Sequence, residues 1–121
     1  MELNDYQKQA MTTCMDSCDN FGYMFINLVG EVGEFASKVA KAIRKDRLSI
    51  DENEKFIFMD TKEEREQFDS ELKKEAGDIL WQLSGLCHVM GWKLEDVAKL
   101  NLEKLASRQQ RGVIDGNGDN R

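Results

Sequence analysis

The sequence of 121 residues contains no proline, the residue that interrupts helices most strongly. It also lacks any apolar run approaching the roughly 20 residues needed to cross a bilayer, and residues 1–9 show no signal-peptide pattern. Hydrophobic residues make up 40% and charged residues 33%, a balance typical of soluble proteins. We therefore expect a single all-α domain over residues 1–121 in the cytoplasm, with no membrane partner.

Cysteine is scarce, and acidic residues outnumber basic ones, 23 to 17. Three cysteines, Cys14, Cys18 and Cys87, suit a reducing compartment better than a disulfide framework. Together with His88 they form only a weak zinc candidate, because the CxxC spacing of zinc sites is absent. The net charge of -6 argues against a nucleic-acid groove, which needs clustered Lys and Arg. Small phosphate ligands held through cations remain compatible with this charge.

Apolar residues spaced by alternating steps of three and four predict long helices. We expect four, over about 4–14, 23–45, 62–90 and 94–111, which would assemble into a four-helix bundle. The clearest stripe, on the second helix, consists of Phe25, Leu28, Val32, Phe35, Val39 and Ala42. Asn4 or Asp5 is a plausible cap of the first helix, Thr61 and Glu64 read as a capping box before the third, and Gly91 is a natural stop after it.

Two segments fall outside these helices. Residues 46–60 are charged around a short apolar group, Phe56, Ile57 and Phe58, and we expect an insertion that forms an extended piece or a lid. Residues 112–121 are rich in glycine and predict a tail or a loop folded over another part of the molecule.

Two pairs of acids carry the chemical signal. Glu31 and Glu34 are three residues apart on the second helix, and Glu75 and Asp78 repeat this spacing on the third, so each pair projects from one helix face. Each acid directly precedes a member of an apolar stripe, which places it at the edge of the core. If the two helices are antiparallel neighbours, the four carboxylates converge and repel one another unless a cation lies between them.

Oxygen ligands of this kind suit Mg²⁺, with Mn²⁺ as an alternative, better than zinc. The competing interpretation is that each acid is a solvated helix residue paired with a Lys or Arg one turn away. In that case the protein would be a non-catalytic helical interaction module.

Basic and polar residues on two helices supply candidate phosphate ligands. Lys38 and Lys41, followed by Lys45, continue the face of Glu31 and Glu34. The full set of candidate substrate-binding residues is Lys38, Lys41, Asn101, Lys104, Arg108 and Arg111. Lys38 is equally compatible with an ordinary pair with Glu34, four residues earlier.

The run LVGEVGE at 28–34 and the run EAGDILW at 75–81 resemble the paired ExxE and ExxD signature of the MazG-like all-α nucleoside triphosphate pyrophosphohydrolases. The segments NLEKL at 101–105, RG at 111–112 and GNGDNR at 116–121 resemble one small bacterial and phage branch of that family. The likeness covers nearly the whole chain.

The resemblance implies Mg²⁺-dependent cleavage between the α and β phosphates of a nucleoside triphosphate, in nucleotide-pool housecleaning. Glu31, Glu34, Glu75 and Asp78 would be metal ligands, and Glu34, with Glu31 as the other candidate, would activate the water. The family is usually dimeric or tetrameric, with a site that can draw on a neighbouring subunit, so a homodimer or homotetramer is expected.

The connection between the two motifs, residues 35–74, is longer than in compact family members, and residues 46–60 are the expected extra piece. The base preference of the family therefore cannot be transferred to this chain from the resemblance. A deoxynucleoside triphosphate is the expected substrate, and a dUTPase-like or phosphoribosyl-ATP pyrophosphohydrolase specificity is the alternative.

Overall fold

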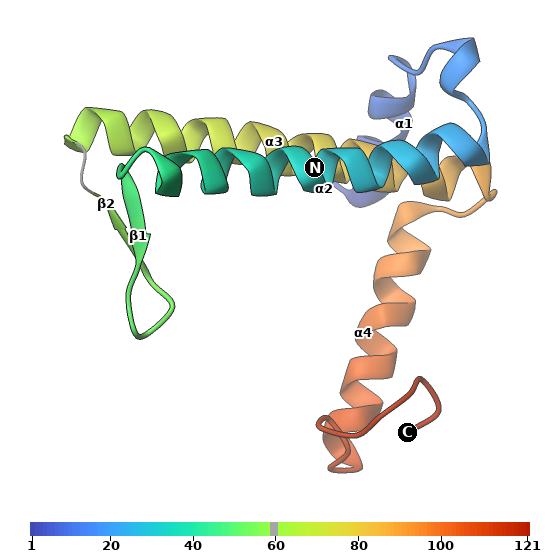
Figure 1. Ribbon diagram of the computed structural model, residues 1–121. Helices are drawn as coiled ribbons and strands as arrows, with labels where there is room; N and C mark the ends of the chain where they lie inside the picture. Colours follow the sequence, from blue (N-terminus) through green and yellow to red (C-terminus); the bar gives the residue numbers. More distant parts are fainter. Residues whose placement is uncertain (59–60) are drawn as a thin grey trace.

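A computed structural model describes residues 1–58 and 61–121. In chain order the elements are α1 (Leu3–Met11), a short 3-10 helix η1 (Asp16–Cys18), α2 (Phe21–Arg44), β1 (Leu48–Ile50), β2 (Phe56–Phe58), α3 (Lys62–Val89) and α4 (Leu94–Gln110) (Figure 1). The prediction of an all-α fold is confirmed, and the helices begin and end within about three residues of the expected positions. None of the described helices has both the length and the apolar character of a bilayer-spanning segment.

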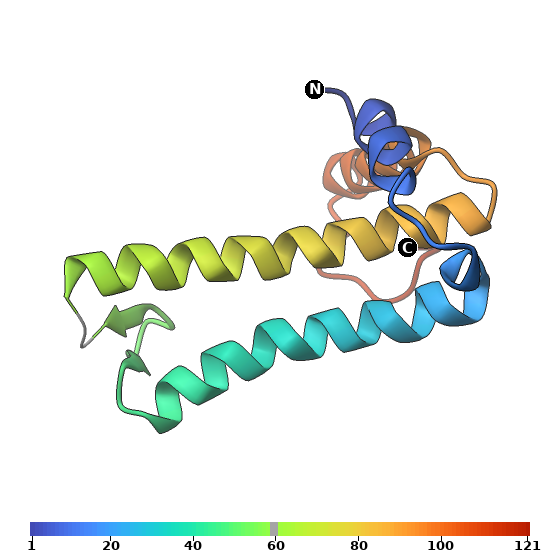
Figure 2. The same ribbon diagram turned by 90° about the horizontal axis from the view of Figure 1, so that it is seen from above.

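The architecture is built on an antiparallel hairpin of α2 and α3, which run side by side along their length (Figure 2). Helix α1 packs against the part of α3 farthest from the ribbon formed by β1 and β2, where the Trp81 indole N–H donates to the carbonyl of Ala10 at 3.0 Å. Helix α4 leads away from the hairpin and carries the tail at its far end (Figure 1). The four helices therefore do not form one stack within the chain.

Local signals fix the ends of the hairpin helices. The Asn20 side chain accepts a hydrogen bond from the backbone N–H of Tyr23 at 2.8 Å and begins α2. Thr61 caps α3 as predicted, accepting from the N–H of Glu64 at 3.2 Å, although the Glu64 carboxylate accepts from the Thr61 hydroxyl rather than from a backbone N–H. Gly91, with a φ of 74°, follows the end of α3 as expected.

Helix α1 supplies the capping groups of α4. The backbone N–H groups of Leu94 and Glu95 donate to the side-chain oxygens of Gln7 and Asn4, at 2.9 and 3.1 Å. The cap position of α1 is Glu2, so the assignment of Asn4 or Asp5 to that position was wrong. Because the first N–H groups of a helix have no partner within it, these two bonds fix where α4 leaves the hairpin.

The insertion forms an antiparallel two-stranded ribbon, in agreement with the expectation of an extended piece. Leu48 pairs with Phe58 and Ile50 with Phe56, and the Asp51 carboxylate accepts from two backbone N–H groups in the connecting turn. Leu48 is buried with Ala42 of α2 and Phe68 of α3, which anchors the ribbon to the end of the hairpin. Residues 59–60 of the predicted segment 46–60 lie outside the described residues.

The face of α2 that packs on α3 matches the predicted stripe at Ala42 and Val39, which lie in and against the core, but differs from it toward the start of the helix. Met24 is fully buried, and its side chain occupies the space that a Cβ at Gly85 of α3 would need. Phe25 and Val32, both assigned to the stripe, are each 50% exposed. The packed face has turned toward Met24 and Glu31, because steps of three and four are compatible with two neighbouring faces of one helix.

Candidate metal centre

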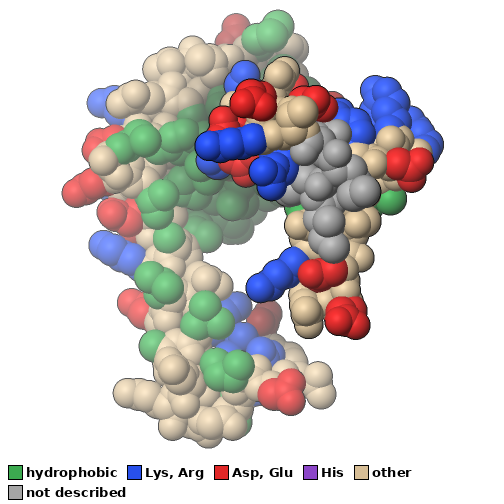
Figure 3. Space-filling model, turned by 90° about the vertical axis from the view of Figure 1, so that its left-hand side faces the viewer, with side chains coloured by type: hydrophobic (Ala, Val, Ile, Leu, Met, Phe, Trp, Pro, Cys, Tyr) green, Lys and Arg blue, Asp and Glu red, His purple; other side chains and the backbone are tan. Residues whose placement is uncertain are grey.

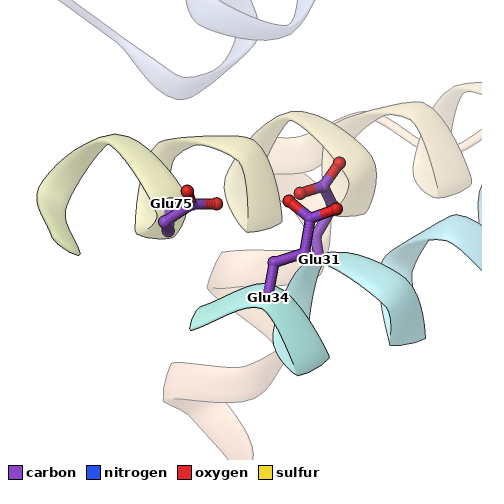
Figure 4. A group of neighbouring side chains, drawn as sticks. All are labelled: Glu31, Glu34 and Glu75. Atoms are coloured by element: carbon purple, nitrogen blue, oxygen red, sulfur yellow. The ribbon is translucent and has the colours of Figure 1, made fainter. Parts of the chain in front are cut away.

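Three carboxylates converge between α2 and α3. One oxygen from each of Glu31, Glu34 and Glu75 lies within 4.8 Å of the others, with the two α2 acids facing Glu75 across the hairpin (Figure 4). The spacing of three residues places Glu31 and Glu34 on adjoining parts of one helix face. The antiparallel hairpin then brings Glu75 opposite them, so three of the four predicted metal ligands form a single group.

The carboxylate group is partly desolvated and only partly satisfied. Glu31 accepts from the Asn27 amide at 3.3 Å through one oxygen, and Glu75 pairs with the Lys38 ammonium at 3.3 Å through one oxygen. The second oxygen of each of these two carboxylates is buried and has no hydrogen-bond partner among the described residues. A buried carboxylate oxygen without a partner is costly, so the site is suited to a bound cation.

The pKa of Glu31 is raised, in agreement with a buried group of like charges. Burial of the carboxyl raises its pKa most, and the negative charges of Glu34, Asp78 and Glu75 raise it further, while the hydrogen bond from Asn27 opposes them. Because the pKa in the folded protein lies above the ordinary value of 4.5, the folded state holds this proton more tightly than the unfolded chain. Ionisation of Glu31 therefore weakens the fold as the pH rises from about 4.5 through the raised pKa.

We expect Glu31→Gln to raise the melting temperature at pH 7 in metal-free buffer, because the change removes a like charge from the group. The advantage over the wild type should shrink as the pH falls toward 4.5, where the wild-type carboxyl becomes protonated. Thermal unfolding followed by circular dichroism across this pH range, in EDTA, measures the difference. A lower melting temperature for Glu31→Gln at pH 7 would contradict this electrostatic account, and Glu66→Gln, on an exposed part of α3, is the control.

Asp78, the fourth predicted ligand, lies beside the group but is not one of the three converging acids. Its charge contributes to the raised pKa of Glu31, and also to that of Tyr6 on α1, where burial is the larger cause. Its assignment as a metal ligand stays a prediction.

The donor set fits a hard divalent cation. Within the described parts of the chain, the converging group of acids, His and Cys consists of carboxylates alone, and oxygen donors favour Mg²⁺ or Mn²⁺ over zinc. The three cysteines are free thiols, and His88 lies 3.5 Å from Asp19. The zinc interpretation therefore gains no support from the geometry.

The predicted cations fall into two groups. Lys38 contacts Glu75 directly. Lys38 and Lys41 also line one crevice of the hairpin. The other group is on α4, and about 20 Å of helix separates Leu94 from Arg108, at the end that leads away from the hairpin (Figure 1). A single chain therefore does not bring Lys104 and Arg108 to the carboxylates.

The tail, residues 112–121, forms ion pairs with the cations of α4. Asp119 lies 3.5 Å from Lys104 and 3.2 Å from Arg108, and these two side chains lower the pKa of its carboxyl. Arg111 donates to the hydroxyl of Ser107 at 3.1 Å and to the carbonyl of Arg121 at 2.5 Å. Residues 112–121 thus fold back on α4 as the composition predicted, whereas Asn101 is exposed. The substrate-binding role of the α4 residues is untested by this arrangement.

Sequence reasoning missed two features of the site. Asn27 is four residues before Glu31, so the hydrogen bond between them follows an ordinary helix spacing that was available in the sequence. Arg47 joins Lys38 and Lys41 only because the chain turns back after α2. No sequence spacing indicates that turn.

Comparison with known proteins agrees with the geometry. The profile of the MazG nucleotide pyrophosphohydrolase domain matches residues 22–113, which include the carboxylate group, the ribbon and α4. The chain therefore belongs to the MazG nucleotide pyrophosphohydrolase family, as its motifs predicted.

The chain is also 36% identical to the Gene 37 protein of Mycobacterium phage L5, in an alignment of 129 residues that covers 100% of both chains. No solved structure matches significantly. Members of this family typically depend on a metal ion, in agreement with the carboxylate group.

Proposed function

We propose that this protein cleaves deoxynucleoside triphosphates to the monophosphate and pyrophosphate with Mg²⁺ as cofactor. The observation that carries the proposal is the group of three carboxylates, two of whose oxygens are buried without a hydrogen-bond partner in the described part of the chain. A bound divalent ion would satisfy those oxygens and neutralise an incoming triphosphate. The membership of the nucleotide pyrophosphohydrolase family supports the class of substrate.

Each carboxylate has a distinct part in the proposed reaction. Glu31 and Glu75, with Asp78 beside them, would hold the ion, and the Asn27 amide orients Glu31 by its hydrogen bond. When bound, the ion supplies Lewis-acid polarisation of the phosphate. Glu34 is the exposed member of the group, so it meets the solvent from which water arrives and is the proposed general base.

The bond changes define the products. The water oxygen bonds to the α-phosphorus, and the bond from that phosphorus to the α,β-bridging oxygen breaks. The bridging oxygen leaves with the pyrophosphate, and the water proton passes to Glu34 and then to solvent. Lys38, which contacts Glu75 at 3.3 Å, lies close enough to offset negative charge on the phosphates.

Pyrophosphate release from a panel of nucleotides tests the proposal. The panel holds the four common dNTPs, the four NTPs, dUTP and phosphoribosyl-ATP, each incubated with Mg²⁺, with Mn²⁺ and with EDTA. We expect release from at least one dNTP that depends on the metal. Preferred cleavage of dUTP or phosphoribosyl-ATP would replace the dNTP assignment, and no cleavage of any nucleotide would overturn the enzymatic proposal.

We also propose that the protein assembles as a homodimer or homotetramer. A compact monomer of 13.9 kDa exposes about 6,700 Å² of surface, whereas this chain exposes 8997 Å². The excess of about 2,300 Å² is of the size that stable oligomer interfaces bury. Figure 3 shows hydrophobic side chains lining the hollow between the hairpin and α4.

The exposed apolar residues also form a pattern. Phe21, Phe25, Val29 and Val32 follow one another on α2 at steps of four, four and three, and each is at least half exposed. Such a stripe fits a helix face of a second copy of the chain. In that assembly the α4 cations Lys104 and Arg108 would exchange Asp119 for the phosphates of a substrate held at the carboxylates of a neighbouring subunit.

A further inference from the structure

A crevice lies at the ribbon end of the hairpin, beside the carboxylate group. Its volume is about 250 Å³. Its lining residues are Lys38, Lys41, Ala42, Lys45, Arg47, Phe68 and Glu71. Four of these side chains carry positive charge and one carries negative charge, in a protein whose net charge is -6. Figure 3, which faces this end of the molecule, shows Lys and Arg side chains gathered beside the ribbon.

The local fold explains why the cations meet. Lys38, Lys41 and Lys45, the C-cap residue of α2, are spaced by three and four residues and so lie along one side of the helix. After the helix, Asp46 adopts a left-handed conformation with a φ of 57°, and the N–H of Arg47 donates to the carbonyl of Ala42 at 2.9 Å. This pattern is a Schellman-type helix end, and it turns Arg47 back toward the lysines.

The crevice adjoins the carboxylates through Lys38. Lys38 lines the crevice and also lies 3.3 Å from Glu75, a member of the acid group. Along α2, Glu34 and Lys41 are separated by about 10 Å of helix rise. The acids therefore lie at one end of a short path along the hairpin, and the cations lie at the other.

We propose that this crevice binds the β and γ phosphates of the substrate, and hence the leaving pyrophosphate. The inference rests on the proposed function and adds the orientation of the bound nucleotide along the hairpin. The α-phosphate lies at the carboxylates, the terminal phosphates point toward Lys41, Lys45 and Arg47, and the nucleoside points toward the opposite end of the hairpin, which carries Tyr23.

The chemistry favours this direction. Negative charge develops on the leaving pyrophosphate as the bond to the α-phosphorus breaks, and cations positioned there stabilise the transition state. Guanidinium and ammonium groups are the side chains that bind phosphate oxygens most strongly. The ribbon insertion is then part of the substrate site, because the turn that begins it carries Arg47.

Direct binding measurements test the inference without relying on turnover. Isothermal titration calorimetry with inorganic pyrophosphate and with inorganic tripolyphosphate, in Mg²⁺ and in EDTA, gives the affinity of the wild type. We expect Lys45→Gln and Arg47→Gln each to weaken both ligands about 10-fold or more. Deoxynucleoside monophosphate should bind these variants as it binds the wild type, since it lacks the phosphates that the crevice holds.

Two controls separate the crevice from general electrostatics and from misfolding. Lys62→Gln removes a charge from a side chain that is 75% exposed at the same end of the hairpin, and it should leave pyrophosphate affinity unchanged. Lys45→Arg keeps the charge and should retain most of the affinity. Equal weakening by Lys62→Gln, or unchanged pyrophosphate binding in both crevice variants, would overturn the inference.

The two proposals fail in different ways. If the wild type cleaves nucleotides and the crevice variants bind pyrophosphate normally, the direction of the substrate is wrong and the enzymatic proposal stands. If no nucleotide is cleaved but pyrophosphate binding depends on Lys45 and Arg47, the crevice is a polyphosphate site and the enzymatic proposal is wrong.

Discussion

Replacing Glu34 by Gln is expected to reduce the rate of pyrophosphate release by about 10²- to 10⁴-fold, the range that a general base contributes. The side chain keeps its size and its place in the carboxylate group but loses the negative charge and the ability to accept a proton. Glu34 is exposed, so the change removes no packing contact. The initial rate with saturating Mg²⁺ and the best nucleotide of the panel gives the comparison.

The matched control for this variant is Glu66→Gln. Glu66 lies on α3, is 69% exposed and pairs at 4.0 Å with Lys62, one helical turn earlier. Glu66→Gln should retain full activity and unfold near the wild-type temperature, whereas Glu34→Gln removes a like charge beside Glu31 and should unfold no lower than the wild type. Activity of Glu34→Gln within a few fold of the wild type would remove Glu34 from the reaction and make Glu31 the next candidate for the base.

Replacing Val29 by Asp is expected to dissociate the oligomer. Val29 is central in the exposed apolar stripe of α2 and is 61% exposed in the single chain, so the fold of one subunit can accept a polar side chain there. A buried, unpaired carboxylate in an interface is costly, since its charge loses water without gaining a partner. Light scattering coupled to size-exclusion chromatography should give the mass of one 13.9 kDa chain, where the wild type gives two or four times that mass.

Met15→Asp serves as the control for the assembly. Met15 is 67% exposed and lies outside α2, so the variant should keep the wild-type mass. A wild-type protein that is monomeric at micromolar concentration would contradict the oligomer, and retention of the wild-type mass by Val29→Asp would place the interface elsewhere. Loss of activity on dissociation would further support a contribution of α4 cations from a neighbouring subunit.

Replacing an acid of the carboxylate group should affect stability and metal binding in opposite directions. Glu31→Gln is expected to stabilise the metal-free protein, while Glu31 is also a proposed metal ligand. Sites that concentrate like charges for binding destabilise the unliganded fold, and the ligand offsets that cost. The melting temperature of the wild type should accordingly rise with Mg²⁺ more than that of the variant.

Most of the helical framework could be predicted from the sequence, because its signals are local. The absence of proline, the apolar spacing, the Thr61 cap and the stop at Gly91 each act within one or two helical turns. The pairing of Glu31 with Glu34 is equally local, since residues three apart always share a helix face. For the same reason the motifs were sufficient to indicate the family that the profile of the MazG domain then matched.

The tertiary structure decided what depends on contacts between distant segments. The face of α2 that packs on α3 was set by the close fit of Met24 against Gly85, which no periodicity distinguishes from the neighbouring face. Asn4 and Gln7 accept from backbone N–H groups of α4 that lie 91 and 87 residues later in the chain, a pairing that local spacing does not encode.

The same distinction applies to the site. The sequence by itself determined which acids share a helix face, but only the hairpin brought Glu75 to Glu31 and Glu34. It named Lys38, Lys104 and Arg108 alike as phosphate ligands, whereas the structure places Lys38 beside the acids and the other two at the far end of α4 with Asp119. The physical reason is that helix geometry relates residues within a few positions, while the approach of two helices depends on side-chain packing and on the turns that connect them.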